Sequence, residues 1–150
     1  MKHKKDSQLI KYFTENGVHY STIVGNSMYP MLRNRKDRII VKSIDKPAAL
    51  LDIVLYKRPS GKIVLHRIIA IRGNHYYICG DNQYHIEKVP KDWISGKLVS
   101  FYREEKYYQV DDIRYIMYSI LCWIFIPLRI IFLFSKNQLF NYGSDRYVRK

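Results

Sequence analysis

The chain has 150 residues, of which 47% are hydrophobic and 15% aromatic, and this content supports one ordinary domain with a buried core rather than two. Lys and Arg number 26 against 13 Asp and Glu, a formal net charge of +13. Such a charge favours a polyanionic neighbour, either nucleic acid or the anionic face of a membrane.

The N-terminal lead, residues 1–20, is basic. Met1–Lys5 has the charge of a signal peptide's first region, but no apolar stretch follows, so we expect no cleavable signal. Weak helical spacing of apolar residues from about Ser7 to Tyr20 predicts a short helix.

Short segments rich in Ile, Val and Tyr then predict strands. They are Arg38–Ser43, Ile53–Lys57, Lys62–Ile71, His75–Cys79 and Gly96–Tyr102. Gly- and Asn-containing turns at 59–61 and 72–74 connect consecutive strands as hairpins. The expected fold class is mainly β, a small, partly closed antiparallel β-fold over residues 21–110.

An apolar segment, Ile113–Phe134, predicts a C-terminal helix over residues 111–135, followed by a basic tail at 136–150. Pro127 and Arg129 interrupt it, and its uninterrupted part of about 14 residues is shorter than the roughly 20 of a spanning helix. Three interpretations stay open: a C-terminal anchor, a kinked helix in the membrane interface with Arg129 snorkelling, or a helix closing over the soluble domain.

Aromatic residues in this segment, with the net charge, favour membrane contact over nucleic acid. Basic residues flank the segment evenly, so the sequence sets no orientation. Cys79 lies beside a Gly-Asp turn and Cys122 within the apolar run. We therefore expect neither a disulfide nor a metal site, and no cofactor.

Three features carry candidate chemistry. Ser27 lies in the run Gly25–Leu32, where flanking Gly and Pro favour a turn that exposes a nucleophilic hydroxyl. His66 interrupts an apolar strand, and an imidazole pKa near 6.5 suits a general base. If the strand alternates strictly, Arg67 points to the opposite face. Asp81 closes the next strand, where it could orient the imidazole. Each feature alone is more often structural.

Together, in this order, the features resemble the conserved boxes of type I signal peptidases. Ser27–Pro30 is similar to the Ser-Met-x-Pro box of the nucleophile, and Leu65–Ile69 to the box of the base. Three further matches are Leu51–Val54, Gly80–Asn82 (the Gly-Asp-Asn box) and Ile94–Val99, so the likeness spans roughly residues 20 to 102. Histidine before the arginine is typical of the archaeal and endoplasmic-reticulum type, whereas the bacterial type and the related self-cleaving SOS repressors place a lysine there.

The resemblance implies a serine endopeptidase that removes a signal or leader peptide from a precursor. Ser27 would be the nucleophile, His66 the base and Asp81 the acid, with Asp52 ranked second for the acid. The backbone of Gly25, Asn26 and Ser27 would hold the oxyanion. Met28 and Pro30, in the box of the nucleophile, are the expected substrate-binding residues.

The short polar lead differs from the N-terminal membrane anchor of signal peptidases. We therefore expect a membrane-associated protein with its catalytic domain on the cytoplasmic side, acting on the leader of a specialised peptide. Its expected partners are this precursor and an anionic lipid surface, with no specific nucleic acid. Two alternatives remain: a self-cleaving repressor-like regulator, whose lysine base, DNA-binding domain and cleavage loop are not visible, and a non-catalytic basic membrane-associated protein.

Overall fold

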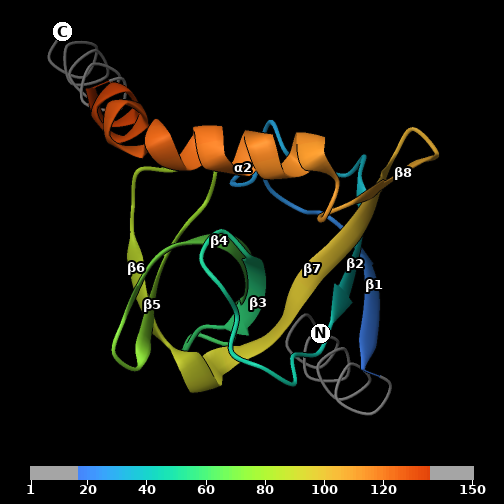
Figure 1. Ribbon diagram of the computed structural model, residues 1–150, viewed down its shortest axis with the longest axis horizontal. Helices are drawn as coiled ribbons and strands as arrows, with labels where there is room; N and C mark the ends of the chain where they lie inside the picture. Colours follow the sequence, from blue (N-terminus) through green and yellow to red (C-terminus); the bar gives the residue numbers. More distant parts are fainter. Residues whose placement is uncertain (1–16, 136–150) are drawn as a thin grey trace, which may run out of the picture.

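A computed structural model describes residues 17–135 and shows a mainly β fold. One antiparallel sheet of eight strands curls into a half-barrel, and two helical segments follow it (Figure 1). The strands are β1 Val18–Thr22, β2 Arg38–Lys42, β3 Ile53–Lys57, β4 Ile63–Arg72, β5 His75–Cys79, β6 Glu87–Pro90, β7 Ile94–Arg103 and β8 Lys106–Gln109. The predicted fold class is confirmed.

β7, which with β4 is one of the two ten-residue strands, lies near the centre of the sheet. The strand order is β1-β2-β7-β3-β4-β5-β6, with β8 also paired to β7. β7 pairs with β3 through its first half and with β2 further along, and register shifts interrupt both ladders. Such bulges bend and twist a strand, and this allows the sheet to close partly on itself.

The predicted bounds of β3 and β5 are those observed, β2 differs by one residue at one end, and β4 and β7 differ by one or two residues at both ends. The strands β1, β6 and β8 were not predicted. Most of the helix expected over Ser7–Tyr20 lies outside the described residues, but its last part is wrong because Val18–Tyr20 belong to β1. β1 lies at an edge of the sheet and pairs only with β2, so the pattern of buried residues that marks a central strand is weak there.

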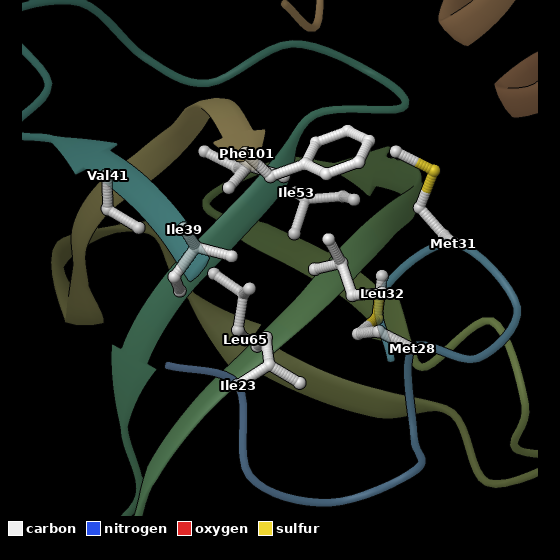
Figure 2. Packing of buried hydrophobic residues seen from close by; sticks show 10 residues of the cluster. Ile23, Met28, Met31, Leu32, Ile39, Val41, Ile53, Leu65 and Phe101 are labelled. Carbon is white, nitrogen blue, oxygen red and sulfur yellow. The ribbon is translucent and has the colours of Figure 1, made fainter. Parts of the chain in front are cut away.

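One hydrophobic cluster attaches the loop between β1 and β2 to the inside of the sheet (Figure 2). Met28 and Leu32 of this loop are fully buried against residues of β2, β3 and β7. Burying one such side chain contributes about 1.5–3 kcal/mol. The loop that carries Ser27 is thus held by packing at Ile23 before the serine and at Met28 and Leu32 after it.

The helix α2, Ile113–Ile124, lies across one end of the sheet (Figure 1). The Asp112 carboxylate caps its N-terminus by accepting from the Arg114 N–H at 2.8 Å. A second helical segment, Ile126–Ser135, follows at a bend of 61°. Within residues 17–135 no single helix meets the length and hydropathy of a membrane span, although the bent pair together does.

The inner face of α2 makes polar contacts with the sheet. The Trp123 indole N–H donates to the Ile69 carbonyl at 2.9 Å. Ile69 lies where the β4–β5 register shifts, so its carbonyl is available, and strict alternation of β4 ends at this point. In the second helical segment, Arg129 donates to the Asp81 carbonyl at 3.0 Å. Arg129 therefore faces the β-fold and does not snorkel away from it.

Candidate active site

Ser27 occupies the loop between β1 and β2, whose backbone is closed by short-range hydrogen bonds. The Leu32 N–H donates to the Met28 carbonyl at 2.8 Å, and the Gly25 N–H donates to Asn34 Oδ1 at 2.9 Å. Gly25 has φ +107°, a conformation that side-chain-bearing residues rarely adopt. The loop turns at Gly25 and leaves Ser27 half-buried beside an open pocket.

The Gly-Asp-Asn box supports this loop from behind. The Asn82 N–H donates to the Ser27 carbonyl at 2.8 Å, and its side-chain amide donates to the Asn26 carbonyl at 3.2 Å. A Cβ on Gly80 would lie 2.6 Å from the Ser27 carbonyl oxygen, closer than any side chain allows. The box therefore positions the serine backbone, because only glycine permits this approach.

Ser27 and His66 line the same pocket, which has a volume of about 240 Å³. One wall is the loop from Ile23 to Met28, and the opposite wall is formed by residues 62–66 at the start of β4. Arg58 and Gln83 complete the lining. The structure thus places the two residues predicted as nucleophile and base at one cavity, although they are far apart in the sequence.

His66 is buried, with only 3% of its surface exposed. The Tyr56 ring packs edge-on against the imidazole, with 6.4 Å between ring centroids. Burial lowers the pKa of His66 to about 4, although the Glu87 carboxylate opposes this shift. At neutral pH the imidazole is therefore uncharged, as a proton acceptor must be.

The carboxylate in contact with His66 is that of Glu87, whose Oε1 lies 3.5 Å from the imidazole Nδ1. Glu87 is itself held by Arg58, whose Nε donates to Oε2 at 2.8 Å and whose Nη2 donates to Oε1. The sequence reasoning missed Glu87 because β6 lacks an alternating apolar pattern. The strand register is what brings Glu87 near His66. Ile68, two residues after His66 on β4, pairs with Ile78 of β5, and Ile78 pairs with Glu87 of β6.

The two carboxylates predicted as the acid lie elsewhere. Asp81 makes a two-point ion pair with Arg67, through Nε to Oδ1 at 2.9 Å and Nη2 to Oδ2 at 2.8 Å. Its Oδ2 also accepts from the Tyr118 hydroxyl at 3.4 Å. Asp52 accepts from the Ala49 N–H at 2.9 Å and lies 3.4 Å from the Lys97 ammonium. In this structure Asp81 joins β5 to α2, and Asp52 shapes the turn before β3.

The remaining predicted site residues divide between the pocket and the surface. Gly25 and Asn26 line the pocket, but the Gly25 N–H, predicted as part of the oxyanion hole, already donates to Asn34 Oδ1. Met28 also lines it while belonging to the core. Pro30 is exposed and outside the pocket lining, and its carbonyl accepts from Arg103 at 3.2 Å. Its predicted contact with substrate therefore has no support in the geometry.

Among residues 17–135, no group of three or more His, Cys, Asp or Glu side chains is arranged to hold a metal ion. Cys79 and Cys122 are both free thiols. No known family model matches the sequence, and no curated protein matches it significantly.

Proposed function

We propose that the chain is a serine endopeptidase, resembling signal peptidases of the histidine type, that removes a signal or leader peptide from a precursor. The observation that carries this proposal is the shared pocket of Ser27 and His66, in which the imidazole is neutral. The pocket lies between the Ser27 loop and the start of β4, which β5 pairs with only from Arg67 onward, so this strand edge suits an extended peptide.

In the proposed reaction neutral His66 removes the proton of the Ser27 hydroxyl as the oxygen attacks the scissile carbonyl. The imidazolium then gives that proton to the leaving amine, and an acyl-enzyme forms. Water, deprotonated by His66, releases the acyl group and restores Ser27. The backbone N–H groups of Asn26 and Ser27 would hold the oxyanion, since the Gly25 N–H already donates to Asn34 Oδ1.

The pH profile of peptide cleavage tests the base. Since burial lowers the pKa of His66 to about 4, kcat/KM for peptides with small residues before the scissile bond should persist in mild acid. It should fall only as pH drops towards that value, because protonated imidazole accepts no proton. Lys62 lines the same pocket and is the rival base.

A profile still rising above about pH 8 would assign the base to Lys62 instead. The matched variants are His66→Ala and Lys62→Gln, of which only the first should lose activity. Absence of cleavage for every such peptide, at every pH at which the protein stays folded, would favour the non-catalytic alternative.

The outer face of the helices supports association with an anionic membrane surface. It exposes large apolar side chains along both helical segments, namely Ile113, Ile116, Met117, Ile120, Leu121, Ile124, Phe125, Leu128, Ile131 and Phe132. The inner face is bound to the sheet through Arg67 and Trp123, and the net charge is +13. A helix with one apolar face suits the plane of the interface. We propose further that the β-fold lies on the cytoplasmic side of this membrane.

Flotation with lipid vesicles checks the membrane proposal. The parent protein should float with vesicles that contain anionic lipid, and a Leu121→Glu/Leu128→Glu variant should float less, because both exposed side chains would have to leave the apolar layer. The exposed Lys57→Glu change, away from the helices, controls for the loss of positive charge. Equal flotation of the parent and the helix variant would refute this surface.

A further inference from the structure

We infer that Glu87 is the positioning residue of His66, holding it in the tautomer that leaves Nε2 free to accept a proton from the pocket. The inference deepens the proposed function and rests on it for its catalytic meaning. It assigns to Glu87 the role that the family resemblance implies for Asp81.

The first support is the environment of Nδ1. This atom is fully enclosed and has no hydrogen-bond partner among the described residues, yet Glu87 Oε1 lies 3.5 Å away. If Nδ1 carried a lone pair, that lone pair would face a carboxylate, an arrangement that stabilises neither group. If Nδ1 carries the proton, a small rotation of either side chain makes a charge-assisted hydrogen bond. The proton therefore belongs on Nδ1.

The second support is that Glu87 is held in place and ionised. Burial acts to raise the pKa of Glu87, but hydrogen bonds from Arg58 outweigh it and bring the pKa below its usual value. The two-point contact with Arg58 also fixes the plane of the carboxylate. The Tyr56 ring, edge-on to the imidazole, restricts its tilt. A charged, oriented acceptor thus faces an oriented ring.

The third support concerns the other charges that act on His66. These are Arg58, Lys62 and Asp81. Arg58 and Lys62 are cations and cannot accept from Nδ1–H. Both carboxylate oxygens of Asp81 accept hydrogen bonds from Arg67. Arg67 follows His66 on β4, so its side chain points to the opposite side of the strand. Of the carboxylates acting on His66, Glu87 alone is in contact with the ring.

The test reads the tautomer directly, by ¹⁵N NMR of the His66 ring at neutral pH in the full chain. In the parent protein Nδ1 should carry the proton. In Glu87→Gln, the amide N–H₂ can point at Nδ1 and donate to it, so the proton should move to Nε2. Asp81→Asn, the matched change at the other candidate, should leave the tautomer as in the parent. Glu87→Asp, which keeps the charge, should retain the Nδ1–H form.

Activity supplies the second readout. Glu87→Gln should lower kcat by about 10²-fold or more with little change in KM, because the base is in the wrong tautomer. Glu87→Asp should recover part of this loss. An Nε2–H parent, or an unchanged tautomer in folded Glu87→Gln, would overturn the inference. The NMR readout needs no substrate, so an inactive parent with a Glu87-dependent tautomer would refute the peptidase and not the positioning.

Discussion

Replacing Ser27 with alanine is expected to reduce peptide cleavage by at least about 10³-fold while leaving the fold intact. The hydroxyl is the proposed attacking atom, and no other group in the pocket reproduces its position on the loop. The loop itself is held by Met28, Leu32 and backbone bonds to Asn82, none of which involves the Ser27 side chain. Steady-state cleavage and urea unfolding, measured on the same preparation, separate the two effects.

Ser60→Ala is the matched control, because Ser60 lies exposed in the β3–β4 turn and outside the pocket. It should cleave as the parent does. A fluorophosphonate probe, which reacts with activated serines, should label Ser27 in the folded parent and label neither Ser27→Ala nor the unfolded chain. Cleavage by Ser27→Ala at the parental rate would end the serine peptidase proposal.

Asp81→Asn is expected to cost about 3–5 kcal/mol of unfolding free energy, since it leaves a buried guanidinium without its counter-charge. The Arg67 and Asp81 side chains are each only 1% exposed. Arg67 also donates to Ser119 of α2 at 2.7 Å and to the Leu51 carbonyl at 3.1 Å. The substitution is nearly isosteric, so the loss reports charge and hydrogen bonding rather than volume. Urea unfolding at neutral pH measures it.

The contrast is Glu104→Gln, which removes the partner of Arg33 in an ion pair whose acidic side chain is 76% exposed. That change should leave the free energy of unfolding nearly unchanged, because water screens an exposed ion pair. A second comparison is the double variant Arg67→Met/Asp81→Leu, which removes both charges and should recover much of the loss. An Asp81→Asn protein as stable as Glu104→Gln would show that water reaches the Arg67 pair.

The pattern of apolar residues in the sequence predicted the strands well where most of their side chains are buried. β3 and β5 alternate or run apolar between clear turns, and their bounds were predictable. β6 and β8 have four residues each, with a proline or polar ends, and exist because β5 and β7 offer them a paired edge. The sequence of a short segment alone does not reveal that it will pair with a neighbouring strand.

The candidate site was predictable in part for a similar reason. The ordered boxes associated Ser27 with His66, and the structure places both at one pocket. The acid was not predictable, because β4 presents adjacent residues, His66 and Arg67, to opposite sides and each takes one carboxylate. Which carboxylate goes to which side depends on the path of the chain from Gly80 to Glu87. In the sequence Arg129 interrupts an apolar pattern, and in the structure it donates to the Asp81 carbonyl.

The Arg67 contacts also set an order for biosynthesis. The eight strands within residues 17–135 all precede α2, so a ribosome makes these strands before it makes Tyr118 and Ser119. Until that helix emerges, the guanidinium of Arg67 has Asp81 and the Leu51 carbonyl but lacks its third partner and its cover. This helix therefore covers the buried charge of Arg67, and a released chain truncated after residue 110 would hold a sheet that is paired but not sealed.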